Sequence, residues 1–271
     1  MEIGDDVVVT RAGITDAAEA TFADSTEIPD RYARPDEVGD GVVVGDDESY
    51  ELPLVDMARL LASESSEAET AKLGSACRDW GFFQGRARQV LREVSSLTRR
   101  LVGFMARDLG VEPEELDGAF RGKTQSVAMH HYPPCRHPDK VIGITPHHDG
   151  LGLALLLHVD DTPGLQVRRG GRWFPLDLLP GALVVNVGDI LQVLTNGQYR
   201  SAEHRVLVDA ERGRATVVMF QDASVAGTVK PLPGLGEARY RAIEYGEYVK
   251  GNFRGLAEGT RFVDSLEMDI A

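Results

Sequence analysis

Three residues in the second half of the chain have side chains that bind metal ions. His147 and Asp149 are two positions apart, so on extended backbone both side chains leave the same face and can hold one ion. The pair alone is weak evidence, because a turn aspartate beside a surface histidine has the same spacing. His204, on another predicted strand, completes a set of two imidazoles and one carboxylate. Such a set leaves coordination positions open on iron(II) for a reactant.

A second pair of side chains follows His204 on the chain. In Arg214-Ala215-Thr216, strand alternation puts a guanidinium and a hydroxyl on one face. This pair can bind a carboxylate through charge-assisted hydrogen bonds. The alternative for Arg214 is a solvated arginine at the end of a strand. All seven histidines lie within residues 130 to 204, which favours a site in this region.

The elements that position these residues change from helices to strands along the chain. Helices are predicted over residues 67–80 and, from apolar residues three and four positions apart, over residues 88–109. Pro113 begins another short helix. From residue 126 onward, short β runs alternate with Gly, Pro and Asp turns. The predicted strands cover residues 126–132, 141–145, 151–159, 165–168, 172–177, 182–187, 190–194, 202–208 and 214–221.

This order of elements predicts a mainly β fold with flanking helices. We expect a double-stranded β-helix (jelly roll) core with an N-terminal helical region. The expected parts are an acidic irregular arm over residues 1–51 with a short strand at 42–44, the N-terminal helical region over 52–124, the jelly-roll core over 125–243, and a C-terminal helix and tail over 244–271. The last helix is predicted over residues 245–253.

The composition excludes several classes of protein. With 42% hydrophobic and 27% charged residues, the chain has a globular composition. Its net charge of −14 comes from the first 70 residues, which hold 19 acidic and 4 basic residues, against 24 and 25 in the rest. Because no basic stripe appears, we expect no nucleic acid partner. No apolar run reaches about 18 residues and no signal-peptide pattern is present, so we expect a cytoplasmic protein without membrane contact. A small-molecule substrate is the expected partner, and the protein is expected to be a monomer.

Several sequence motifs together resemble one enzyme family. The motifs are His131-Tyr132-Pro133-Pro134-Cys135, residues 143–150 with Pro146-His147-His148-Asp149-Gly150, residues 180–189, residues 196–201 and Glu203-His204-Arg205. They resemble the plant-type 2-oxoglutarate/iron(II)-dependent dioxygenases of the isopenicillin-N-synthase-like superfamily. Within that family, the sequence is most similar to the norcoclaurine-synthase-like and alkaloid O-demethylase-like branch.

The resemblance implies a cofactor set and roles for particular residues. The implied iron ligands are His147, Asp149 and His204, and the implied 2-oxoglutarate ligands are Arg214, Thr216 and Tyr132. The implied cofactors are Fe(II), the co-substrate 2-oxoglutarate and O2, with ascorbate in a supporting role. The implied activity is that of an oxidoreductase that hydroxylates, O-demethylates or desaturates a small, largely apolar secondary metabolite or hormone.

Three further residues are expected in the substrate pocket: His130, Phe220 and Asp222. His130 stands where the family commonly has Asn, and alternation puts it on the same face as Tyr132. The alternative is a histidine satisfied by backbone partners. The apolar residues 151–157 are expected to line the pocket or, at alternate positions, to pack in the core.

The sequence departs from the family after Gln84, where it passes through Gly85-Arg86-Ala87 directly to the long helix. Family members reach that helix several dozen residues later, after segments that help to wall the substrate pocket. Two alternatives to an active dioxygenase therefore stay open. One is a catalytically impaired relic of the family with a residual metal site. The other, a jelly-roll protein with non-oxidative metal chemistry, leaves Arg214 and Thr216 without a purpose.

The pocket role of His130 gives a first prediction. If His130 contacts the co-substrate or the substrate, the His130→Asn variant has an altered Michaelis constant for at least one of them. Steady-state kinetics with each varied in turn measures this. Unchanged Michaelis constants for both would count against the role.

Overall fold

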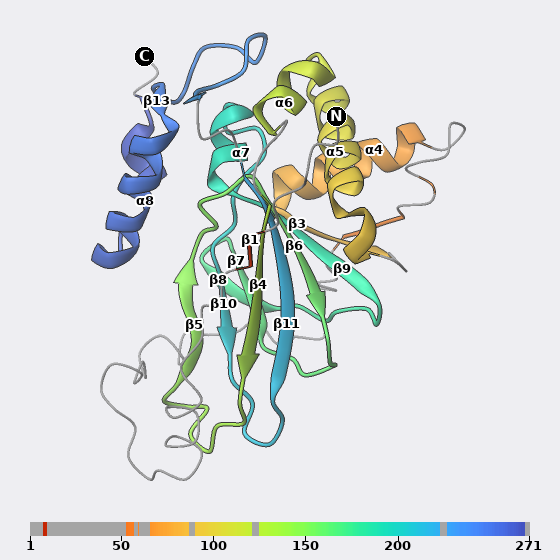
Figure 1. The fold of residues 1–271 in the computed structure, drawn as a ribbon, viewed down its shortest axis with the longest axis vertical. Coiled ribbons are helices and arrows are strands. Elements are labelled where there is room, and N and C mark those ends of the chain that lie inside the picture. The colour runs from red at the N-terminus through yellow and green to blue at the C-terminus, as the bar shows by residue number, and fades with distance from the viewer. Residues whose placement is uncertain are drawn as a thin grey trace.

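The structure, a computed structural model, describes residues 8–9, 53–56, 59, 66–86, 90–120, 125–222 and 227–268. Its centre consists of two facing β-sheets with helices around them (Figure 1). The larger sheet has the strand order β1(Val8–Val9), β4(Gln125–Tyr132), β11(Arg214–Gln221), β6(Leu153–His158), β9(Ala182–Val187), β3(Phe82–Arg86), β2(Leu54–Val55). The smaller has the order β5(Ile142–His147), β10(His204–Leu207), β7(Leu165–Arg169), β8(Arg172–Pro175).

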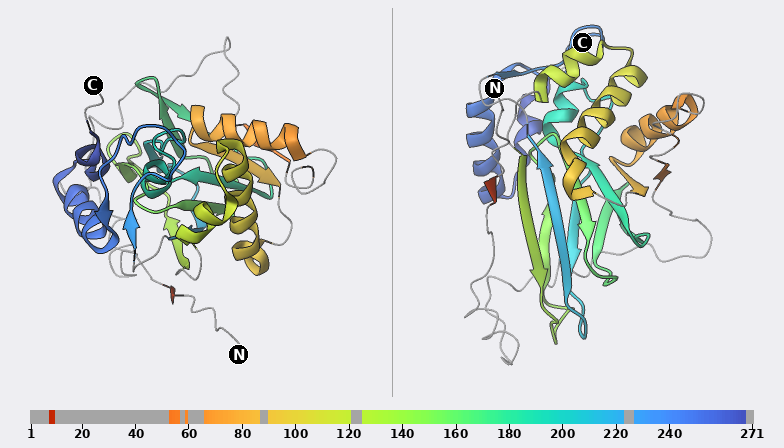
Figure 2. Two further views of the ribbon diagram at one scale, coloured as in Figure 1. Left: turned by 90° about the horizontal axis from the view of Figure 1, so that it is seen from above. Right: turned by 45° about the vertical axis from the view of Figure 1, so that its right-hand side comes forward.

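Strand alternation gives the larger sheet two different faces. On one face, residues such as Leu153 and Leu155 of β6 and Val185 of β9 are buried in the main core. That core includes residues of α4(Ser66–Asp79), α5(Val90–Leu109) and α6(Pro113–Phe120), the helices that pack beside the sheet (Figure 2). On the other face, residues such as Val184 pack in a second cluster with Val206 of the smaller sheet. The space between the sheets is therefore separate from the helical core.

The predicted jelly-roll fold and most of its predicted elements are confirmed. The predicted strand over residues 190–194 is wrong, because these residues belong to helix α7(Asp189–Leu194). All six residues of α7 are buried. A short, fully buried apolar run carries no periodicity that separates helix from strand, which is why the pattern failed here. Gly188, in extended conformation, separates the end of β9 from this helix.

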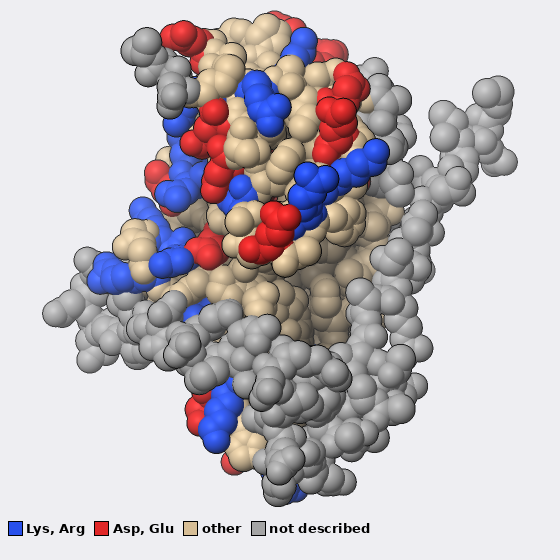
Figure 3. Space-filling model, turned by 90° about the vertical axis from the view of Figure 1, so that its left-hand side faces the viewer, with Lys and Arg blue, Asp and Glu red and all other residues tan. Residues whose placement is uncertain are grey.

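The C-terminal part of the chain folds beside the loop that follows β5 and contains Asp149 and Gly150. β12(Thr228–Val229) and β13(Ile243–Glu244) pair and lead into helix α8(Tyr245–Glu258), which is longer than predicted and ends at Gly259 in the left-handed conformation. The hydroxyl of Tyr248 donates a hydrogen bond of 2.9 Å to the carbonyl of Gly150. A 3-10 helix over Phe262–Leu266 follows. On the side of the molecule where α8 lies, acidic and basic side chains are interspersed among uncharged ones (Figure 3).

Two expectations concern residues that the structure does not describe or that border them. The strand expected at residues 42–44 and nearly all of the acidic arm lie outside the described residues. The short connection expected after Gln84 lies between β3, which ends at Arg86, and α5, which begins at Val90. The expected boundaries between the four parts stay predictions.

A close backbone approach at Gly188 gives a prediction about stability. A Cβ at this position would lie 2.0 Å from the carbonyl oxygen of Leu151 and 3.0 Å from that of Asp149. Since backbone must move to admit it, Gly188→Ala should lower the free energy of unfolding by about 1–3 kcal/mol. Urea denaturation measures the change.

The control for Gly188→Ala is Gly103→Ala in helix α5, where a Cβ would meet no atom within 4 Å. Alanine has a higher helix propensity than glycine, so this variant should be as stable as the wild type or slightly more stable. Equal stability of Gly188→Ala and the wild type would contradict the close approach.

Candidate metal centre and co-substrate site

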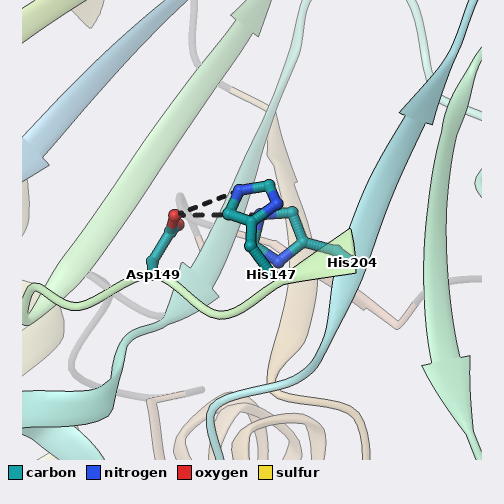
Figure 4. Close-up of side chains that lie close together, drawn as sticks. All are labelled: His147, Asp149 and His204. Carbon is teal, nitrogen blue, oxygen red and sulfur yellow. Dashed lines mark ion pairs between the residues drawn. The ribbon is translucent and has the colours of Figure 1, made fainter. Parts of the chain in front are cut away.

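The three expected metal ligands converge at one end of the smaller sheet. His147 is the last residue of β5 and His204 the first of β10, and the two are register partners. Asp149 lies in the loop after β5, so the extended backbone expected from His147 through Asp149 ends at His147. The Nε2 atoms of both histidines nevertheless lie 3.8 Å from Oδ1 of Asp149 (Figure 4). One potential ligand atom from each residue lies within 4.8 Å of the others, so the three can hold one metal ion.

Backbone carbonyls orient both imidazole rings. Nδ1 of His147 lies 2.8 Å from the carbonyl oxygen of Thr145, and Nδ1 of His204 lies 3.1 Å from that of Ala202. A carbonyl oxygen only accepts, so Nδ1 carries a hydrogen in each ring, and in the neutral imidazole the lone pair is then on Nε2. Both lone pairs belong to the nitrogen that faces Asp149, as a metal ligand requires.

The carboxylate of Asp149 is held from the larger sheet. Nδ2 of Asn186, on β9, donates a hydrogen bond of 2.7 Å to its Oδ2, which leaves Oδ1 facing the histidines. Burial alone would raise the pKa of Asp149, but the neighbouring His204 and His147 and the Asn186 hydrogen bond outweigh it and lower the pKa. Burial also lowers the pKa of His204 to about 4. At neutral pH, Asp149 is therefore ionised and His204 neutral, the states that bind a metal ion.

A buried ion pair supports the loop from behind. The backbone N–H of Asp189 donates to the carbonyl of Asp149 at 2.7 Å. The carboxylate of Asp189 is only 1% exposed and pairs with the guanidinium of Arg261 at 2.6 Å. Burial raises the pKa of Asp189, and Arg261 opposes that shift. The C-terminal segment thus contributes to the shape of the ligand loop.

His148, between the two ligands, turns away from them. Its Nδ1 lies 3.2 Å from the carbonyl oxygen of Ser201. Burial, assisted by the positive charge of Arg261, lowers the pKa of His148 to about 3. This imidazole is therefore neutral and is not part of the ligand group.

A cavity between the two sheets opens onto the ligands. Its walls combine polar side chains with a larger apolar surface from both sheets. It is lined by Phe82, His130, Tyr132, Ile144, His147, Asp149, Leu156, Leu165, Val184, Asn186, His204, Val206, Arg214, Thr216, Val218 and Phe220. All three ligands and both residues of the Arg-x-Thr pair thus share one cavity.

Buried polar atoms without partners mark the place of a ligand in this cavity. Arg214 and Thr216 are each 2% exposed. Among the described residues, Nε and Nη1 of Arg214 and Oγ1 of Thr216 have no hydrogen-bond partner. Leaving such atoms unsatisfied is costly, and a carboxylate would accept from all three. The guanidinium carbon also lies 5.3 Å from the ring centre of Tyr132, whose pKa burial raises to about 12. The solvated strand-end alternative for Arg214 is therefore wrong.

The other expected pocket residues are partly brought together. His130 and Phe220 line the cavity, and the ring of His130 stacks on that of Tyr132 with 6.1 Å between centroids. Burial, then the charge of Arg214, lowers the pKa of His130, so its ring is neutral. Asp222 is not among the described lining residues. It follows the end of β11, and its carboxylate accepts a hydrogen bond from the hydroxyl of Tyr245 on α8.

Two polar residues of the site, Asn186 and His158, were given no role by the sequence. Asn186 was part of a family motif but had no role assigned to it. The signal for Asn186 is a single amide inside the apolar run of β9, since a buried amide needs a partner. His158, at the end of the apolar run of β6, contacts Arg214 and carries the same kind of signal.

Comparisons with known proteins agree with this geometry. Residues 123–223 match the 2OG-Fe(II) oxygenase superfamily, and residues 52–106 match the N-terminal region of non-haem dioxygenases described for morphine synthesis. Protein SRG1 of Arabidopsis thaliana is 31% identical, over 90% of this chain and 93% of its own length. The chain belongs to the 2OG-Fe(II) oxygenase superfamily. It is therefore an oxidoreductase of a family that uses Fe(II), 2-oxoglutarate and O2, as the sequence motifs predicted.

Other members of this superfamily extend the comparison. Codeine O-demethylase of Papaver somniferum is 27% identical over 94% of this chain and 95% of its own length. A crystal structure of JOX2 in complex with 2OG, Fe and JA has a TM-score of 0.76 at 21% identity and covers 95% of this chain and 99% of that one. A structure of a rice dioxygenase for auxin oxidation has a TM-score of 0.67 at 23% identity, over 80% of this chain and 98% of that one. These structures share the fold.

The same comparison bears on the expected shortening. The alignment with Protein SRG1 runs over 332 positions, more than the 271 residues of this chain. The relative therefore has residues without a counterpart here, in agreement with an internal shortening. Its position after Gln84 stays a prediction. Within the described part of the chain, no helix has the length and apolarity needed to cross a membrane.

The hydrogen bond from Asn186 to Asp149 gives a prediction about metal affinity. Asn186→Leu should weaken iron(II) binding by about 10–100-fold, because groups that orient a metal ligand have effects of this size. Without the donated hydrogen bond the pKa of Asp149 rises, so the metal should also be released at a higher pH. Anaerobic equilibrium titration at several pH values measures both effects.

Gln84→Leu is the matched control for Asn186→Leu. Gln84 is also a buried amide of the larger sheet, but its side chain bonds to the backbone of Asp177 and Leu179. The control should bind iron(II) like the wild type. Equal affinities for Asn186→Leu and the wild type would show that Asn186 does not orient the ligand.

Proposed function

We propose that this protein oxidises a small, largely apolar organic molecule by hydroxylation, O-demethylation or desaturation, at the expense of 2-oxoglutarate and O2. The observation that carries the proposal is the buried Arg-x-Thr pair in one cavity with the ligand triad, because donors of this pair have no partner among the described residues. A jelly roll with non-oxidative metal chemistry gives this pair no ligand. A 2-oxoacid with a distal carboxylate offers one group to the metal and another to this pair.

The residues of the chain have separate tasks in such a reaction. Iron(II) with bound 2-oxoglutarate supplies the activation of O2. His147, Asp149 and His204 bind the metal through two neutral nitrogens and one carboxylate oxygen. Arg214 and Thr216 bind the distal carboxylate and so fix the co-substrate. The apolar walls exclude water from the reacting atoms.

The lining of the cavity supports an apolar substrate. Phe82, Ile144, Leu156, Val218 and Phe220 surround the polar groups. The metal and the co-substrate would take up most of those polar groups, so few anchors would be left for a polar substrate. Relatives named as demethylases of codeine, thebaine and a flavonoid favour an aromatic or alkaloid-like secondary metabolite. The supporting role of ascorbate, the monomeric state and the cytoplasmic location stay predictions.

The relic remains the second candidate because of one observation, the short connection between β3 and α5. The family resemblance implies that segments after this strand help to wall the substrate pocket, and Phe82 of the same strand lines the cavity. A cavity that lost part of its wall would bind metal but lose substrate.

Anaerobic titration of the iron(II)-loaded protein with 2-oxoglutarate tests the proposal. Chelation of the metal should produce a visible metal-to-ligand charge-transfer band in the wild type. His204→Ala lacks one metal ligand and should show no band, whereas His137→Ala, outside the cavity lining, should behave like the wild type. No band from folded, iron-bound wild-type protein would favour the relic. A band would direct the search to substrates, with succinate formation as the readout.

A further inference from the structure

The guanidinium of Arg214 is bound on one side by a histidine from the neighbouring strand. His158 is the last residue of β6 and pairs in register with Thr216 of β11. Its Nε2 lies 2.8 Å from Nη2 of Arg214. All nitrogens of a guanidinium are donors, so Nε2 of His158 must be the acceptor.

The ring of His158 is held in this acceptor state. Burial lowers its pKa to about 4, and the charge of Arg214 acts in the same direction. The ring also hydrogen-bonds the backbone of Asp160. A neutral imidazole satisfies one N–H of Arg214 without neutralising its positive charge. A carboxylate in the same place would compete with a bound anion for that charge.

The turn after His158 holds the backbone on either side of Arg214. The hydroxyl of Thr162 donates to the carbonyl of Gly213 at 2.8 Å. The carboxylate of Asp160 accepts from the backbone N–H of Ala215 at 2.6 Å and from that of Thr162 at 3.0 Å. One short segment, residues 158–162, therefore fixes both the backbone and the side chain of Arg214.

We propose that His158 is a positioning residue for the co-substrate: by binding Nη2 of Arg214, it turns the remaining guanidinium donors toward the distal carboxylate of 2-oxoglutarate. This inference rests on the proposed function. It explains why Nε and Nη1 of Arg214 have no partner among the described residues while Nη2 has one. Without His158, the long side chain of Arg214 can adopt other rotamers. Binding of the carboxylate must then also order this side chain, which lowers the affinity for 2-oxoglutarate.

The test compares two substitutions of His158 in the full-length, iron(II)-loaded protein under anaerobic conditions. His158→Leu removes the acceptor and should raise the dissociation constant of 2-oxoglutarate, measured by calorimetry, about tenfold. His158→Gln keeps an acceptor oxygen and should restore the affinity to within about threefold of the wild type. His137→Leu, the same change outside the cavity lining, should have no effect.

A shorter 2-oxoacid separates positioning of Arg214 from damage to the metal centre. 2-Oxobutyrate can chelate the metal but has no distal carboxylate for Arg214. Its affinity should be the same in the wild type and in His158→Leu. Melting temperatures show whether each variant folds, and if His158→Leu does not, His158→Met repeats the measurement with a side chain of closer volume.

The outcomes distinguish the inference from the function on which it rests. A wild-type protein that does not bind 2-oxoglutarate overturns both. A wild-type protein that binds it, together with an unchanged dissociation constant in His158→Leu, overturns the positioning role alone. Equal losses of affinity for 2-oxoglutarate and 2-oxobutyrate also overturn it, because His158 would then act on the metal centre or on the fold.

Discussion

The pairing register of two strands is the constraint on which the site depends. β10 aligns His204 directly with His147 of β5, and the same strand pairs on its other side with β7. Side chains alternate between the faces of a sheet, so a shift of one residue would turn His204 out of the cavity. In the larger sheet, β11 depends on the same rule, since Arg214, Thr216 and Val218 face the cavity together. The chemistry thus requires two sheets in register, each contributing one end of the site.

The electrostatics of the cavity follow from what this register buries. Charged groups are costly to bury unless they are paired or hydrogen-bonded. Asp149 has Asn186 and two imidazoles, while Arg214 has one neutral histidine, the ring of Tyr132 and two nitrogens without a partner in the described part of the chain. The group around Asp149 already has the ligands that a metal ion needs. The group around Arg214 has its hydrogen-bonding capacity satisfied only when an anion is bound. A buried cation of this kind costs stability in the free protein and is a source of affinity for the ligand.

Much of the fold and of the site could be predicted from the sequence, for reasons that differ between residues. Strand alternation predicted that Arg214 and Thr216 face the same way, and family motifs predicted the candidate metal ligands His147, Asp149 and His204, which the structure brings together. The hydrophobic residues of α7 show no periodicity typical of either a helix or a strand, so the sequence could not distinguish the two there. Asn186 and His158 act through partners that are distant in sequence, and a single sequence does not contain that pairing. The prediction that Asp222 lines the pocket was not met, because β11 ends at Gln221 and the strand alternation does not extend to the next residue.

The ion pair between Asp189 and Arg261 has a consequence for the order in which the protein matures. The two residues are 72 positions apart, and Arg261 leaves the ribosome after every metal ligand has been synthesised. Until it arrives, the carboxylate of Asp189 has no cation beside it, and the loop that carries Asp149 lacks its support from behind. The loop that carries Asp149 therefore gains this support only after the C-terminal segment has been synthesised and has docked.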